Sequence, residues 1–168
     1  DRGEIDLSLS DVELRPLIDE AVIGLKDQMQ ELGLNLDIMI EPTIGVVSVD
    51  EKRIRQILFN LLSNAIGFSD KGQTICVEAR LFQNDLIVEI RDEGRGIPSD
   101  LLPHLFDRFE TRSGGTRHRG AGLGLSLVKA LVELHGRHVM IDSEAGRGTR
   151  VICHFPQNRP SDDATKAA

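Results

Sequence analysis

The stretch "IRQILFNLLSNAIGFSDKG", residues 54–72, decides the fold of this 168-residue chain. Its apolar residues recur three and four positions apart, which is the spacing of one face of an amphipathic helix. These core candidates are Ile54, Ile57, Leu58, Leu61, Leu62 and Ala65. Asn60 and Asn64 fall on another face, where a spacing of four brings their side chains together. The stretch predicts a helix, capped by Asp50, that buries one face and presents two carboxamides on another.

Further elements flank this helix on both sides. Helical spacing returns in residues 11–33 and 123–136, and each of these segments closes at a glycine. Alternating and β-branched residues indicate strands elsewhere. The expected strands are one or two within 34–49, a hairpin of 74–81 and 86–91 joined by "FQND", and a last hairpin within 137–155 that turns at 146–148. Residues 92–122 read mostly as loop, and a loop of that length in a compact domain is typically functional or disordered.

The composition bounds the class of protein. With 40% hydrophobic and 28% charged residues, the chain is typical of a soluble globular domain. A formal net charge of -7 argues against a nucleic-acid binder, because affinity for phosphate backbones comes from clustered Lys and Arg. No stretch approaches the ~20 apolar residues that span a bilayer, and the first residues lack a signal-peptide pattern. We therefore expect a cytoplasmic domain without direct membrane contact.

The two cysteines carry no metal-site pattern. Cys76 and Cys153 each lie in a strand-like segment, and neither belongs to a CxxC or similar spacing. Free cysteine is among the most buried residue types. Both are therefore expected to be buried, reduced thiols.

The segment "DEGRGIP", residues 92–98, is a first candidate for a binding loop. Asp92 ends a predicted strand, and Gly94 and Gly96 follow it. Because glycine has no side chain and tolerates positive φ, a flat ligand can approach the backbone beside the carboxylate. Taken alone, the segment is equally compatible with a plain hairpin turn.

The segment "RSGGTRHRGAGLGLSLVK", residues 112–129, is a second candidate. Glycines at the mouth of a helix leave backbone N–H groups facing an anion, and the helix dipole adds to the attraction. No acidic residue occurs between Glu110 and Glu133, whereas several basic residues do. The pattern indicates a phosphate cradle, with a flexible solvated loop as the alternative. A P-loop is excluded because no GxxxxGK[ST] occurs.

In their order and spacing these segments resemble a known family. "NLLSNA", "DEGRGI", "LFDRF", "GAGLGLSLVK" and "GRGT" are similar to the N, G1, F, G2 and G3 boxes of the ATP-binding catalytic domain of sensor histidine kinases. The resemblance covers residues 14–156 and implies the Bergerat fold. That fold is an α/β two-layer sandwich, in which a mixed, largely antiparallel five-stranded sheet packs on three helices. Residues 1–13 are then expected to be a linker from upstream dimerisation helices, and 157–168 a disordered tail.

The resemblance also implies roles for individual residues. Asp92 would accept from the adenine amino group, Asn64 would be the Mg²⁺ ligand, and Asn60 would lie on the phosphate side. Asn60 and Asn64 are also the two residues expected to be catalytic. Residues 112–120 would form a mobile lid, with Phe106 and Phe109 at its base. The full expected ATP-binding set is Asn60, Asn64, Asp92, Gly94, Gly96, Ile97, Phe109, Arg112, Arg119, Gly120, Ala121, Gly122, Leu123, Gly124, Leu125 and Thr149.

Chemistry supports this use of the asparagines over simple capping or solvent exposure. Mg²⁺ prefers oxygen ligands, and Asn offers one without adding negative charge beside a triphosphate. Related ATPases of this fold carry a Glu four residues before the metal Asn, where it activates water. Asn60 stands at that place and cannot act as a general base. The chain is therefore expected to hold ATP with little hydrolysis.

Three departures from the family pattern keep a second reading open. Gly67 stands where Lys or Arg usually reaches the phosphates, Ala121 replaces a Thr, and Arg137 replaces a Gly. None of the five histidines is followed by Asp or Glu, as an acceptor histidine commonly is. One reading is a kinase domain that phosphorylates a His on its own dimerisation helices, within a homodimer, and serves a response regulator or another kinase. The alternative is a noncatalytic, nucleotide-sensing scaffold.

Overall fold

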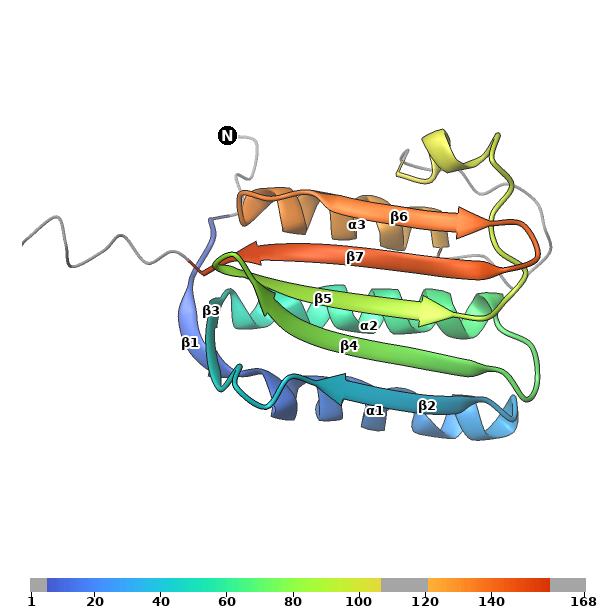
Figure 1. Ribbon diagram of the computed structural model, residues 1–168, viewed down its shortest axis with the longest axis horizontal. Coiled ribbons are helices and arrows are strands. Elements are labelled where there is room, and N and C mark those ends of the chain that lie inside the picture. Colours follow the sequence, from blue (N-terminus) through green and yellow to red (C-terminus); the bar gives the residue numbers. More distant parts are fainter. Residues whose placement is uncertain (1–5, 107–120, 158–168) are drawn as a thin grey trace, which may run out of the picture.

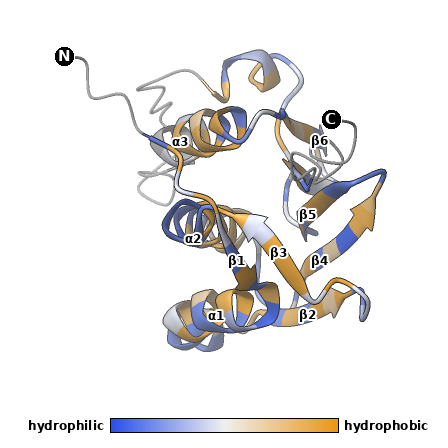
Figure 2. Cartoon of the chain, turned by 90° about the vertical axis from the view of Figure 1, so that its left-hand side faces the viewer, coloured by the Kyte–Doolittle hydropathy of each residue, from blue (hydrophilic) through white to orange (hydrophobic). Residues whose placement is uncertain are grey.

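The computed structural model describes residues 6–106 and 121–157, which form two layers (Figure 1). One layer is a five-stranded sheet in the order β2-β4-β5-β7-β6. The other contains three helices, all on the same side of the strands in the end-on view of Figure 2. The strands are β2 (Asn35–Ile40), β4 (Thr74–Phe82), β5 (Asp85–Asp92), β6 (Val139–Glu144) and β7 (Gly148–Pro156). The helices are α1 (Leu14–Glu31), α2 (Glu51–Phe68) and α3 (Ala121–Leu134).

The strand pairing is largely antiparallel, as expected. Only β2 and β4 run parallel within the described sheet, while β4-β5, β5-β7 and β6-β7 are antiparallel. A short 3₁₀ turn, η1 (Leu102–His104), follows the loop after β5. None of the described helices is both long and apolar enough to cross a bilayer. The expected sandwich of a five-stranded sheet and three helices is therefore confirmed.

Helix α2 is the central element of the core. It packs between α1 and α3 and against the middle strand β5. All six apolar residues predicted for its buried face are at most 3% exposed. Because both neighbouring helices and the sheet bury that face, α2 cannot rotate about its axis, and its remaining side chains keep a fixed orientation relative to the sheet.

The β4-β5 connection is tighter than the sequence predicts. Phe82 and Asp85 pair with each other, so the turn contains only Gln83 and Asn84 rather than the four residues of "FQND". Both turn residues have positive φ, +48° and +66°. That geometry matches the right-handed twist of the two strands, so pairing continues up to the turn.

Two expectations about residues outside the central motifs need correction. Residues 10–13, which the sequence places in a linker, form strand β1 (Ser10–Glu13), antiparallel to β3 (Val46–Val49). Cys76 is only half-buried, because it lies on the sheet face opposite the helices, whereas Cys153 points into the core. Burial raises the pKa of the Cys153 thiol to about 12, so this thiol stays protonated.

Asp50 ties the beginning of the domain to α2. Its carboxylate accepts the backbone N–H of Arg53 at 3.2 Å, as predicted for the cap, and that of Ser8 at 2.8 Å. Its own N–H donates to Nε2 of His135 at 3.2 Å. Burial alone would raise the pKa of Asp50, but the hydrogen bonds from Ser8 and Arg53 outweigh it and lower the pKa. His135 thus has a structural role in holding the start of α2.

Asp50→Ala is expected to lower the free energy of unfolding by about 1–2 kcal/mol, because it removes a helix cap and leaves two backbone N–H groups without their acceptor. Urea denaturation at neutral pH measures this. The matched control is Asp19→Ala, which removes an exposed carboxylate paired with Arg15 at 3.1 Å. That pair is worth at most about 1 kcal/mol. Equal losses in the two variants would contradict the capping role.

Candidate nucleotide site

A pocket opens between α2, α3 and the sheet at the end where β5 finishes and β7 begins. Its walls are mainly apolar and come from both layers. The lining residues are Leu61, Asn64, Ala65, Phe68, Ile90, Asp92, Ile97, Leu125, Ile141, Thr149 and Val151. Apolar walls with a few fixed polar groups are typical of a site for a flat, partly polar ligand.

Asp92 is the charged group in this pocket. It is the last residue of β5, pairs with Thr149 across the sheet, and is 8% exposed. Burial raises the pKa of its carboxyl to about 6, although hydrogen bonds from the N–H groups of Gly94, at 2.9 Å, and Thr149 pull the pKa downward. A carboxylate has about four acceptor positions, so these two bonds leave capacity for a ligand amino group.

Ser143 is a site residue that the sequence did not reveal. Its hydroxyl lies 2.8 Å from that of Thr149 and accepts the N–H of Ile97 at 2.8 Å. It also donates to the carbonyl of Gly148 at 3.1 Å. Ser143 therefore fixes the loop after Asp92 against the β6-β7 hairpin. In the sequence, Ser143 is an ordinary polar residue of a predicted strand. Only the register that pairs it with Thr149 could have indicated its role at the site.

Two glycines hold the loop after Asp92 against its neighbours. A Cβ placed on Gly94 would collide with the backbone carbonyl of Phe68 at the end of α2. Gly96 has a φ of +68°, and a Cβ there would collide with the carbonyl of Glu144 at the end of β6. Only glycine permits both contacts, so the loop bridges α2 and β6 at the rim of the pocket.

The two asparagines of α2 lie next to the first turns of α3. A Cβ placed on Gly124 would lie 3.6 Å from both amide atoms of Asn64 and 3.8 Å from Cβ of Asn60. Nδ2 of Asn64 is buried and has no hydrogen-bond partner among the described residues. Buried polar atoms are rarely left unpaired, so this carboxamide is suited to a ligand or an ordered water.

These residues fit a Mg²⁺–nucleotide better than a metal held by protein alone. Within the described residues, no three His, Cys, Asp or Glu side chains gather into a metal site. Mg²⁺ usually takes one or two protein oxygens together with waters and phosphates. Oδ1 of Asn64, a residue that lines the pocket, can supply such an oxygen, and its Nδ2, which has no partner among the described residues, can donate to a phosphate oxygen.

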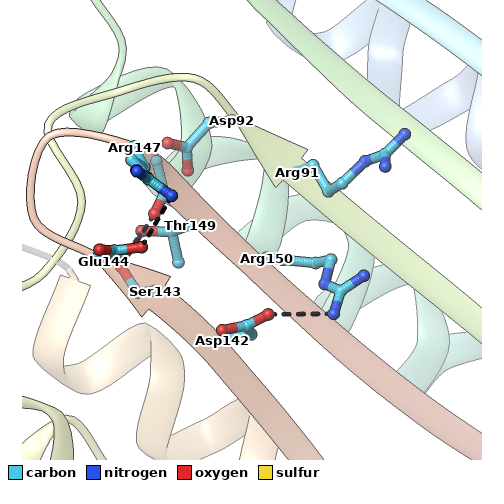
Figure 3. Close-up of a pocket in the computed structure, with 9 residues that line it drawn as sticks. Arg91, Asp92, Asp142, Ser143, Glu144, Arg147, Thr149 and Arg150 are labelled. Atoms are coloured by element: carbon cyan, nitrogen blue, oxygen red, sulfur yellow. Dashed lines mark hydrogen bonds and ion pairs between the residues drawn. The ribbon is translucent and has the colours of Figure 1, made fainter.

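A second hollow lies beside this site, on the sheet face that none of the described helices covers (Figure 3). Two of the arginines that line it form ion pairs. Arg150 pairs with Asp142 at 3.0 Å and with Glu89 at 3.1 Å, and Arg147 pairs with Glu144 at 3.5 Å. This hollow therefore offers no uncompensated positive charge from Arg147 or Arg150.

The structure locates only part of the predicted ATP-binding set. Asn64, Asp92, Ile97, Leu125 and Thr149 line one pocket. Asn60, Gly94, Gly96 and Gly124 lie at its edges. Ala121, Gly122 and Leu123 belong to the first turn of α3. The predictions for Phe109, Arg112, Arg119 and Gly120 fall outside the described residues.

Comparison with known proteins assigns the family. A family model described as histidine kinase-, DNA gyrase B-, and HSP90-like ATPase matches residues 49–159, more than half of the chain. The chain belongs to this family. The resemblance drawn from the five motifs is thereby confirmed.

Relatives of this ATPase-family chain are sensor proteins. The sensor protein DivL of Caulobacter vibrioides is 36% identical over 95% of the chain, and the chain spans 20% of DivL. The circadian input-output histidine kinase CikA of Synechococcus elongatus is 37% identical over 79% of the chain, which spans 18% of CikA. The chain is thus an ATP-binding domain of the type found in sensor histidine kinases.

Solved structures agree with this assignment. Full-length ShkA in complex with AMPPNP aligns with a TM-score of 0.80 and 26% identity, over 90% of this chain and 32% of ShkA. A nucleotide-free catalytic domain of the histidine kinase ThkA aligns with a TM-score of 0.79 over 89% of this chain and 96% of that domain. At 23% identity, the likeness to ThkA shows the fold alone.

Proposed function

We propose that this domain binds ATP with Mg²⁺ and donates the γ-phosphate to a histidine on dimerisation helices that are not part of this chain. The full-length protein would act as a homodimer on the cytoplasmic side and pass the phosphate to a response regulator or another kinase. The observation that carries the proposal is that the Asp92 carboxylate and Asn64, whose Nδ2 has no partner among the described residues, line one pocket together with apolar side chains.

In this proposal each group of residues has a separate task. Asp92 accepts from the adenine amino group, and the hydrogen-bonded Thr149 and Ser143 keep the neighbouring backbone in place. Asn64, with Asn60 one helical turn earlier, faces the phosphates across the backbone of Gly124. A bound Mg²⁺ would offset the charge of the triphosphate. Catalysis of phosphoryl transfer consists largely of such positioning and charge stabilisation.

Low intrinsic hydrolysis follows from the choice of side chain at position 60. Activation of a water requires a base that accepts its proton, and a carboxamide has no such capacity near neutral pH. A phosphate donor benefits from this, because the bound ATP survives until the acceptor histidine arrives.

Titration calorimetry of this chain with ATP tests the binding step. We expect saturable binding that is stronger with Mg²⁺ than with excess EDTA. If the folded protein gives no binding heat, released or absorbed, with ATP under either condition, the proposal is rejected. Transfer is tested by incubating the chain and radiolabelled ATP with a dimerisation domain from a related kinase.

A scaffold that only senses nucleotide is the second candidate, and Gly67 is the observation that favours it. Arg137, another departure from the family pattern, bears on this choice less than the sequence implied. It pairs with Asp85 at 3.1 Å, at the opposite end of β5 from Asp92. That ion pair is structural. Gly67→Lys distinguishes the candidates, because a kinase limited by a missing cation should gain transfer activity, whereas a scaffold should gain nothing.

A further inference from the structure

Three polar residues form a row across the strands at the pocket end of the sheet. Asp92 on β5 pairs with Thr149 on β7, and Thr149 pairs with Ser143 on β6. Residues directly opposite each other in neighbouring strands point to the same face of the sheet. Figure 3 labels all three side chains at this end. Asp92 and Thr149 are 8% and 7% exposed and line the candidate pocket, whereas Ser143 lies on the far side of Thr149 from Asp92.

The contacts of Ser143 determine which hydroxyl donates to which. Oγ of Ser143 accepts the N–H of Ile97 at 2.8 Å and donates its hydrogen to the carbonyl oxygen of Gly148 at 3.1 Å. Its third contact is with Oγ1 of Thr149 at 2.8 Å, where either oxygen could donate. A hydroxyl has a single hydrogen, and a carbonyl oxygen can only accept. Since the Ser143 hydrogen is used on Gly148, Thr149 is the donor in the contact between the two hydroxyls.

This direction turns Thr149 into an acceptor toward the pocket. Its hydroxyl hydrogen points to Ser143, so only lone pairs of Oγ1 are left for a ligand. The neighbouring Asp92 carboxylate also accepts only, once the pH is above its pKa of about 6. An amino group carries two hydrogens and can donate to two adjacent acceptors. A carbonyl oxygen at the same place would face acceptors alone, and a polar group without a partner in a buried site is costly.

We infer that Ser143 is a positioning residue that fixes the direction of the Thr149 hydroxyl and thereby favours a base with an amino group over one with a carbonyl oxygen. The inference rests on the proposed function, in which Asp92 accepts from the adenine amino group. Ser143 acts through Thr149, because it is not among the residues that line the pocket. Its hydroxyl thus has a second task besides holding the loop after Asp92.

Ser143→Ala is expected to lower the preference for ATP over inosine triphosphate about tenfold, which is the size of one neutral hydrogen bond. Inosine triphosphate carries a carbonyl oxygen in place of the amino group. Without Ser143, the Thr149 hydroxyl can turn and donate to that oxygen, so the affinity for inosine triphosphate should fall less than the affinity for ATP. Ser143→Thr keeps a hydroxyl and should retain the preference to within about threefold.

A role in holding the loop alone makes a different prediction, because a displaced loop would weaken the binding of both nucleotides alike. Thr149→Val separates the two roles, since it removes the hydroxyl that Ser143 directs. Thr149→Val should itself lower the preference for ATP. Adding Ser143→Ala to Thr149→Val should lower that preference no further, because residues that act through one contact are not additive.

Calorimetric titration with each nucleotide and Mg²⁺ measures the affinities, and thermal melts show whether each variant folds. The titrations are made at pH 8, above the pKa of about 6 of Asp92. The matched control is Ser10→Ala, which removes a serine hydroxyl from an exposed residue of β1, outside the five-stranded sheet. If Ser143→Ala does not fold, Ser143→Cys carries the same expectation, because a thiol accepts hydrogen bonds only weakly.

Three results would overturn the inference and leave the proposed function intact. The first is equal affinity of the unaltered chain for ATP and inosine triphosphate. The second is a preference that Ser143→Ala leaves unchanged, and the third is a loss of preference that is just as large in the presence of Thr149→Val. Failure of the unaltered chain to bind either nucleotide would overturn both the inference and the proposed function.

Discussion

Asp92→Asn is expected to weaken ATP binding by about 10- to 100-fold, because a hydrogen bond to a charged acceptor is worth about 1.5–3 kcal/mol. The substituted side chain has nearly the same shape but presents an amide hydrogen toward part of the pocket. It can no longer accept with both oxygens, so the adenine amino group and the N–H of Gly94 compete for one acceptor. Calorimetric titration with ATP measures the loss.

The same substitution is expected to stabilise the folded protein above pH 6. Burial raises the pKa of Asp92 from its ordinary value of 3.8 to about 6. Protonated Asp92 is tolerated in the buried site, so its stabilising contribution is fully present below pH 3.8. This contribution is lost as the pH rises through 6, which lowers the free energy of unfolding by roughly 3 kcal/mol. Asp92→Asn removes this cost, so the gain should be small near pH 4 and largest near pH 8.

Urea denaturation at several pH values tests the sign of this effect. Asp142→Asn is the matched control, since Asp142 lies on the open face of the sheet with a side chain that is 70% exposed. The control should change neither ATP affinity nor the pH dependence of stability appreciably. If Asp92→Asn loses as much stability with rising pH as the unaltered chain does, Asp92 is not the titrating group.

Asn64→Ala is expected to remove most of the benefit that Mg²⁺ gives to ATP binding. The unaltered chain should bind ATP more tightly with Mg²⁺ than with EDTA, and the variant should bind with similar, low affinity in both. The physical reason is that the variant lacks a protein oxygen ligand, and Mg²⁺ requires oxygen ligands in near-octahedral geometry. A tenfold or larger loss in the presence of Mg²⁺ is the expected size.

Gln56→Ala provides the control on the same helix, because it deletes an exposed carboxamide that bonds only weakly to Arg53, at 3.4 Å. Its affinity for ATP should match that of the unaltered chain in both buffers. If Asn64→Ala keeps the full Mg²⁺ effect, another group holds the metal and the assignment of Asn64 is wrong.

Much of the fold could be predicted because its signals are local. The buried face of α2 and the Asp50 cap each follow from residues within a few positions of one another. The turn of the β6-β7 hairpin, predicted at 146–148, lies one residue earlier, at 145–147, because Glu144 pairs with Gly148. The motif order also gave the family, because glycines and carboxamides at fixed spacing have few other uses. The prediction for the β4-β5 turn was wrong by two residues, since twist and pairing decided where the strands ended.

The sequence by itself determined the helices, most of the strands and the residues proposed to bind the nucleotide, because periodicity and side-chain chemistry act at short range. Only the tertiary structure decided which distant groups meet. It placed Ser143 beside Thr149, Arg137 beside Asp85, and Arg95 over Gly67. Such contacts depend on sheet register and on the packing of loops against helix ends.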